Sequence, residues 1–206
     1  VVFGSLLVSD LLALRTLDLS SLRRVAELTI VDNAALRTIV ARNLHSVAGH
    51  PMFEDATVGT LQVAENPALE LLSVSQLQLA GVVSIEGNAQ LRQVNLPALG
   101  HEASGAILRV EVLQNTALEG VSLDSLANVG TLNITENSSE FFAIHVPVLD
   151  TVYGRLRVAS NPFLTRLEAS QLKHVFDPLE VTDYRRLTHV QLPALTATAA
   201  LVVERN

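Results

Sequence analysis

A pattern of about 22 residues recurs along the chain, and this period constrains the fold more than any other feature. Its clearest copies occupy residues 61–77 and 83–99. Both copies read L-x-I-x-x-N-x-x-L-x-x-V-x-L-x-x-L, where every written L, I or V is an aliphatic residue. A unit of this size cannot bury its apolar side alone and must stack on its neighbours. The period therefore predicts a solenoid.

The same pattern predicts about eight coils and the opening of a ninth. Residues in excess of the period fall around 48–60 and 100–105, where we expect loops. The unbroken series predicts one domain over residues 1–206. Because the ninth copy stops at Asn206, we expect the chain to be part of a longer repeat protein. The predicted coils are 6–25, 28–47, 61–77, 83–99, 110–129, 132–152, 156–175 and 179–195.

Each copy contains two short stretches in which aliphatic residues alternate with others, L-x-I and V-x-L. This alternation indicates strands, and the Asn-Pro and Leu-Pro steps interrupt any helix of useful length. We therefore predict an all-β fold with two strands per coil, joined by a turn at the asparagine. Stacked coils of this kind form a right-handed parallel β-solenoid of the leucine-rich-repeat type.

Asparagine recurs at the corner position of the pattern. At a corner between two sheets, inward-facing backbone groups lack ladder partners, and an amide side chain can both donate to them and accept from them. We expect these side chains to stack as a buried ladder with a structural role. The members of the predicted ladder are Asn33, Asn66, Asn88, Asn115, Asn137 and Asn161.

Composition excludes several classes of function. The net charge is −7 and no run of Lys or Arg occurs, which argues against nucleic acid as a partner. With no cysteine, disulfides, thiolate metal sites and cysteine nucleophiles are excluded. Apolar stretches are too short to span a bilayer, so we expect no membrane insertion. We expect no cofactor either.

The outward positions of the first strand form a polar row from coil to coil, and a rigid solenoid face of this kind is typical of a recognition surface. Glu111 and Glu180 in this row stand three coils apart, too far to cleave one glycosidic bond together. We expect the row to contact a protein or glycan partner. Its residues are Thr29, Gln62, Ser84, Glu111, Asn133, Arg157 and Glu180.

Other residues suggest weaker chemistry. The adjacent outward residues His145 and Glu168 are expected to pair on the surface of the second strand. His50 with Glu54 and Asp55 forms a candidate metal site, although a solvated loop explains these three residues more simply.

Asparagine and aromatic residues supply further candidates. Asn133 begins an N-x-T sequon on an outward position, so it is a candidate for glycosylation. Asn137 also begins a sequon, but its place in the buried ladder should block modification. Aromatic residues gather late in the chain, and we expect Phe141 and Phe163 to fill widened coils. Phe142 and Tyr153 are expected to stand out as binding anchors. The group also contains Phe176 and Tyr184, the latter at the asparagine position of its coil.

The L-x-I-x-x-N-P-x-L phrase at 61–69 and, loosely, at 156–164, with L-P-x-L at 96–99 and 192–195, resembles the receptor L-domain family. It is also similar to the relatives of that family in fungal cell-wall proteins and in bacterial and protist surface proteins. The resemblance implies an extracellular or cell-surface module that binds partners without catalysis. Two alternatives stay open: a structural spacer or adhesin stalk without a ligand, and a carbohydrate-active β-helix enzyme.

Overall fold

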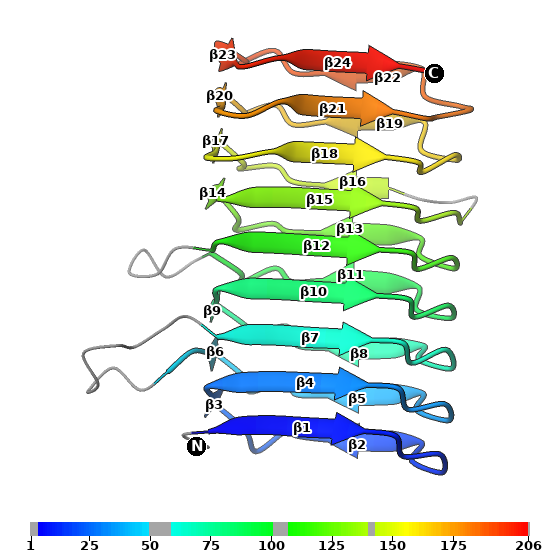
Figure 1. Ribbon diagram of the computed structural model, residues 1–206. Coiled ribbons are helices and arrows are strands. Elements are labelled where there is room, and N and C mark those ends of the chain that lie inside the picture. Colours follow the sequence, from blue (N-terminus) through cyan, green and yellow to red (C-terminus); the bar gives the residue numbers. More distant parts are fainter. Residues whose placement is uncertain (1–3, 50–58, 101–106, 140–142, 206) are drawn as a thin grey trace.

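The computed structural model describes residues 4–49, 59–100, 107–139 and 143–205. The chain winds repeatedly around one axis, and strands of successive coils lie side by side along the stack (Figure 1). Every strand pair is parallel. The prediction of an all-β parallel solenoid is confirmed, since the described residues hold strands and turns and no helix.

The first face of the solenoid is one continuous nine-stranded sheet. Its strands are the L-x-I stretches of the repeat, and each step along the sheet is one coil. This face therefore gives a single rigid surface along the whole stack. The strands, in order, are β1 (Ser5–Ser9), β4 (Glu27–Val31), β7 (Thr60–Ala64), β10 (Val82–Glu86), β12 (Arg109–Leu113), β15 (Thr131–Thr135), β18 (Leu156–Ala159), β21 (Leu179–Thr182) and β24 (Leu201–Glu204).

The second face carries the V-x-L stretches as shorter strands in three separate ladders, β2-β5-β8, β11-β13-β16 and β19-β22. These strands hold only three residues each, so the second sheet is narrower than the first. Its strands are β2 (Thr16–Asp18), β5 (Thr38–Val40), β8 (Leu71–Ser73), β11 (Gln93–Asn95), β13 (Gly120–Ser122), β16 (Ala143–His145), β19 (Arg166–Glu168) and β22 (His189–Gln191).

A third face closes the coil, and here the prediction of two strands per coil is wrong. Most coils add a two-residue strand after the last leucine of the repeat, in the ladders β3-β6-β9 and β14-β17-β20-β23. Two residues are too few to show alternation, so the pattern does not reveal them. The strands are β3 (Arg24–Val25), β6 (Ser46–Val47), β9 (Leu79–Ala80), β14 (Asn128–Val129), β17 (Thr151–Val152), β20 (His174–Val175) and β23 (Ala197–Thr198).

Two four-residue turns join the faces, and they explain both proline phrases of the sequence. In the first turn, the leucine amide three residues after the asparagine donates to the asparagine carbonyl, as from Leu69 to Asn66 at 3.0 Å. In the second, Leu99 donates to Leu96 at 3.2 Å. Pro67 and Pro97 occupy the second position of these turns, where the fixed φ of proline suits a type I turn.

The asparagine ladder is present as predicted, and its side chains are fully buried. Asn66 shows the bonding: its Nδ2 donates to the carbonyl of Ala64 in its own coil at 2.8 Å and to that of Ile30 in the preceding coil at 3.0 Å. Its backbone N–H donates to Oδ1 of Asn88 in the following coil at 3.2 Å. One amide thus links three coils and satisfies corner groups that have no ladder partner.

A second column, not anticipated from the sequence, precedes the ladder. The residue immediately before each ladder position has a left-handed backbone, with φ between 52° and 65°. This conformation is costly for residues with a Cβ unless the surroundings impose it. It reverses the chain at the corner, and from Asn33 to Tyr184 the side chain that follows is buried. The column contains Asp10, Asp32, Glu65, Gly87, Gln114, Glu136, Ser160, Asp183 and Arg205.

The core is a continuous column of aliphatic side chains inside the coils. Leu69, Leu91 and Leu118, which follow the asparagines, are fully buried. Small branched side chains suit this narrow interior, as the scarcity of aromatic residues suggests. Across the part of the chain that the structure describes, no helix is long and apolar enough to cross a membrane.

Candidate functional site

The predicted outward row forms one line along the middle of the first face. The strand register places Gln62 beside Ser84, Ser84 beside Glu111 and Glu111 beside Asn133. The row continues from Asn133 to Arg157 and Glu180, and it begins at Thr29 beside Gln62. All seven side chains are partly exposed. The periodic pattern alone therefore predicted this row correctly, although its role as a binding surface stays a prediction.

Charged side chains enter the outward row of the first face at Glu111 and recur toward its C-terminal end. Glu180 pairs with two arginines, its Oε2 lying 3.3 Å from Arg157 Nε and its Oε1 3.7 Å from Arg155 Nε. Arg109 and Glu111 form a looser pair at 3.9 Å. Exposed ion pairs contribute little to stability, so these groups can exchange their partners at small cost. The N-terminal half of the row, from Thr29 to Ser84, is uncharged.

Asn133 lies in the middle of β15, between Glu111 and Arg157 of the neighbouring strands. Its side chain points outward as predicted, but its Oδ1 atom is shielded from solvent and has no hydrogen-bond partner among the described residues. The hydroxyl-bearing Thr135 of the same sequon is buried. Glycosylation of Asn133 stays a prediction.

His145 pairs differently from what the sequence suggests. Its Nε2 lies 3.7 Å from Oδ1 of Asp124, in the turn of the preceding coil, and Glu168 instead pairs with Arg166 of its own strand. The predicted His145–Glu168 pair is therefore wrong, because the imidazole lies beside the carboxylate of the turn and Glu168 has a partner in its own strand. The same Asp124 oxygen accepts a 2.5 Å hydrogen bond from Ser122.

Ser122, Asp124 and His145 bring the residue types of a hydrolytic triad together, but in the wrong order. In such a triad the imidazole stands between hydroxyl and carboxylate, so that it can take the hydroxyl proton. Here the carboxylate of Asp124 stands between the other two groups. The Ser122 hydroxyl donates its hydrogen bond to this carboxylate and not to the imidazole. This arrangement orients the turn and does not activate the serine.

The candidate metal-binding residues of the sequence lie outside the part of the chain that the structure describes. No group of three or more His, Asp or Glu residues in the described ranges is arranged to hold a metal ion. The candidate metal site at His50, Glu54 and Asp55 lies outside those ranges, as do Phe141 and Phe142.

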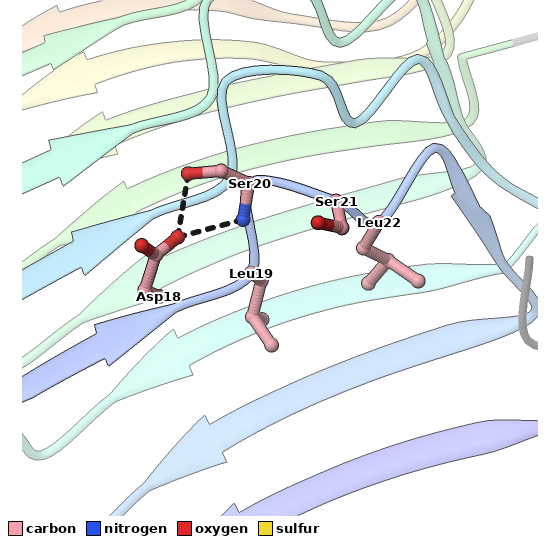
Figure 2. Close-up of a pocket in the computed structure, with 5 residues that line it drawn as sticks. All are labelled: Asp18, Leu19, Ser20, Ser21 and Leu22. Atoms are coloured by element: carbon pink, nitrogen blue, oxygen red, sulfur yellow. Dashed lines mark hydrogen bonds between the residues drawn. The ribbon is translucent and has the colours of Figure 1, made fainter.

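A small open hollow lies over the second turn of the first coil, lined by residues 18–22 (Figure 2). Oδ1 of Asp18 accepts hydrogen bonds from the backbone N–H and the hydroxyl of Ser20, at 2.8 and 2.5 Å. These bonds hold the pKa of Asp18 below its usual range. Oδ1 is thus engaged within its own turn, and Asp18 is the one charged residue among the five that line the hollow.

The described aromatic residues divide between the interior and the surface. Tyr184 takes the ladder position of the eighth coil and is buried, and burial raises the pKa of its hydroxyl well above the usual range. Phe163 does not fill a widened coil as predicted: it lies partly exposed at the first turn, outside the core, with the guanidinium carbon of Arg186 5.0 Å from its ring centroid. Tyr153 is exposed on the third face, as predicted.

The sequence placed Phe176 among the late aromatic residues and His174 among the surface histidines, but it did not predict that both lie beside Tyr153. The Tyr153 and Phe176 rings are 6.0 Å apart at 4° to each other, and His174 lies 6.3 Å from Phe176. The step from Tyr153 to Phe176 is 23 residues, one period of the repeat. That equal phase was the signal available in the sequence.

Comparisons of this chain with family models, with curated proteins and with solved structures give no significant match.

Proposed function

We propose that the chain is a non-catalytic recognition module at the cell surface or outside the cell, and that the first face binds a protein partner. The observation that carries the proposal is the unbroken, in-register polar row on a sheet fixed by the asparagine ladder. A rigid surface loses little conformational entropy when a partner binds. The resemblance of the L-x-I-x-x-N-P-x-L phrase to receptor L-domains supports the same role.

The dimensions of the first face suit a protein better than a small ligand. Strands of about 17 Å, stacked about 4.8 Å apart over nine coils, give a surface of roughly 700 Å². This approaches the roughly 800 Å² that each partner contributes to a typical protein interface. The ion pairs of Glu180 with Arg155 and Arg157 supply charges for a complementary partner.

Enzymatic roles have weaker support in the geometry. Glu111 and Glu180 are separated by two intervening strands of the first face, so they cannot flank one bond. The hydroxyl, carboxylate and imidazole of Ser122, Asp124 and His145 are in the wrong order for acyl transfer. A spacer without a ligand is the alternative that the experiment must separate from recognition.

The test compares two triple variants of matched composition. Gln62→Ala with Ser84→Ala and Arg157→Ala alters the first face. The control, Gln93→Ala with Ser73→Ala and Arg166→Ala, removes the same residue types from outward positions of the second face. Retention of the fluorescently labelled chain on intact cells of the source organism, before and after protease treatment, is measured together with the melting temperature.

We expect the first-face variant to lose about tenfold in retention, which corresponds to about 1.4 kcal/mol, and the control to behave as the parent. Protease treatment of the cells should abolish the part of the parent's retention that the first-face variant loses. Equal retention of all three chains would support the spacer and overturn the proposal. Retention that survives protease but responds to the first-face variant would assign a glycan to that face.

A further inference from the structure

A second surface, separate from the first face, carries an exposed aromatic pair. Tyr153 and Phe176 follow β17 and β20 at the same position of consecutive coils, and 63% and 60% of their surfaces are exposed. Backbone hydrogen bonds hold both positions, from Tyr153 to Val129 at 2.9 Å and from Phe176 to Val152 at 3.0 Å. Large exposed aromatic rings that are held rigidly on a soluble surface are typical of binding sites.

The residues at the neighbouring positions of this column are small. The position before Tyr153 in this column is Gly130, and the position after Phe176 is the exposed Ala199. A side chain at Gly130 is excluded, because a Cβ there would overlap the carbonyl oxygen of Leu108. The two rings therefore stand as a parallel pair with small neighbours at both ends of the column.

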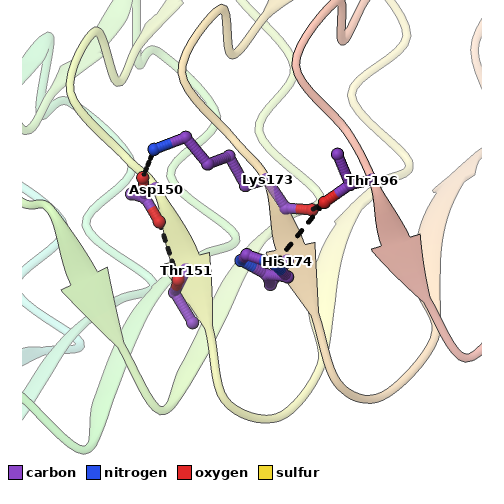
Figure 3. Close-up of polar contacts among 5 residues, drawn as sticks. All are labelled: Asp150, Thr151, Lys173, His174 and Thr196. Carbon is purple, nitrogen blue, oxygen red and sulfur yellow. Dashed lines mark hydrogen bonds and ion pairs between the residues drawn. The ribbon is translucent and has the colours of Figure 1, made fainter.

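Hydrogen-bonding groups border the pair on the same face. His174 lies on β20 two residues before Phe176, and strand alternation puts both side chains on the outer surface. Near the preceding turn, Asp150 accepts from Lys173 Nζ at 2.5 Å and from the Thr151 hydroxyl at 2.9 Å (Figure 3). On the opposite side of the pair, the Asp177 carboxylate lies beside Gly154.

We propose that this surface binds a pyranose ring of a glycan. The apolar C–H face of a sugar ring packs on an aromatic ring while its hydroxyls reach neighbouring carboxylate, imidazole and ammonium groups, and both kinds of group are present here. The site recognises one or two sugar units of a longer chain.

The geometry disfavours other ligands. An aromatic cage for a quaternary ammonium group needs rings at steep angles to one another, and these rings are parallel within 4°. Nucleic-acid bases also stack on aromatic rings, but such sites need basic surroundings, and this chain carries a net charge of −7. Two rings and an imidazole are also far smaller than the surface that a stable protein complex buries.

The probe is a panel of insoluble β-glucan, chitin and mannan particles, with sedimentation as the measurement. Tyr153→Ala and Phe176→Ala remove one ring each, and Tyr153→Phe retains the ring while losing only the hydroxyl. The control is Phe163→Ala, which removes a partly exposed ring from another corner. Melting temperatures show whether each variant is folded.

We expect the parent to sediment with at least one of the three polysaccharides. Each of Tyr153→Ala and Phe176→Ala should weaken this binding about tenfold, with Tyr153→Phe and Phe163→Ala close to the parent. A parent that binds none of the three polysaccharides would overturn the proposal. So would alanine variants that bind as the parent does, or a loss shared equally by Phe163→Ala.

Tyrosine fluorescence gives a second readout on the same site. The chain has two tyrosines and no tryptophan, so Tyr184→Phe leaves Tyr153 as the sole fluorophore of this kind. A soluble oligosaccharide of the retained polysaccharide should change this emission and saturate. Bound oligosaccharide without any such change would place the sugar elsewhere. The first-face variant leaves both rings intact. The cell-retention test of the first face and the polysaccharide test of this surface can therefore give a negative result independently of each other.

Discussion

The central coils and the eighth coil carry the same repeat but differ in how completely it is satisfied. In the centre, Asn88 is fully buried and bonds to the coils on both sides, and Leu69 and Leu91 are inaccessible to solvent. In the eighth coil, Tyr184 takes the asparagine position and Leu187 takes the leucine position, which is only partly buried. The stability of one coil therefore depends on what lies above and below it, as expected for a quasi-one-dimensional stack.

The ladder position shows the difference most clearly. A central asparagine completes hydrogen bonds in its own coil, the preceding one and the following one. The Tyr184 hydroxyl is buried near Asn161, yet it has no partner in hydrogen-bonding geometry among the described residues. The tyrosine fills the corner with a ring and gives up the polar link between coils.

The largest expected contrast is between two leucines at the same position of the repeat. Leu69→Ala should lower the free energy of unfolding by about 2–5 kcal/mol, because it leaves a cavity between covered coils. Leu187→Ala in the same 206-residue chain should cost less than about 1.5 kcal/mol, since its side chain is already partly exposed. Urea unfolding of both variants measures the difference. Equal losses would show that the two coils are equally well packed.

The second contrast concerns the ladder position itself. Asn88→Ala should cost about 1–3 kcal/mol, because buried backbone groups of two coils lose their partner. Tyr184→Phe should stay within about 1 kcal/mol of the parent, since the hydroxyl it removes has no partner. Urea midpoints again provide the measurement. A large loss in Tyr184→Phe would indicate that the hydroxyl contributes a link after all.

The smallest expected effect is on the pH dependence of stability at two aspartates. Asp18 accepts hydrogen bonds within its own turn, and Asp150 is bonded to a lysine of the next coil. Hydrogen bonds from Ser20 lower the pKa of Asp18, whereas Lys173 of the next coil, followed by Thr151, lowers that of Asp150. A lowered folded-state pKa contributes stability that is present above the unfolded value of about 3.8 and is lost as pH falls through the folded-state value. On acidification, the melting temperatures of Asp18→Asn and Asp150→Asn should therefore fall less than that of the parent.

Salt distinguishes the two aspartates. The link from Asp150 to Lys173 is an exposed ion pair, so its contribution at neutral pH should shrink with added NaCl. The hydrogen bonds to Asp18 come from neutral donors, and the nearby charge of Arg42 is the smallest cause that lowers its pKa, so Asp18 should respond less to salt. Thermal melts of Asp18→Asn and Asp150→Asn at low and high salt measure this difference. An equal salt response in both variants would remove the distinction between the two sites.

The sequence by itself determined the parallel β-solenoid, the asparagine ladder and the polar row of the first face. Each of these depends on whether a residue at a given phase points inward or outward, and a repeat records that information at every coil. For Gln62, Ser84 and Asn133 the alignment of equal phases was sufficient to place them in one line.

Only the tertiary structure decided how the coil closes and which side chains meet. The third strands are too short to leave a pattern, and the left-handed residues before the ladder have no common identity, from Asp32 to Gly87 to Arg205. The partner of His145 depended on a turn carboxylate, and the pairing of Tyr153 with Phe176 depended on ring orientation. The position of a residue in the repeat tells whether its side chain points inward or outward. Which side chains touch also depends on the distances and angles between them, and these are set only by the folded coils.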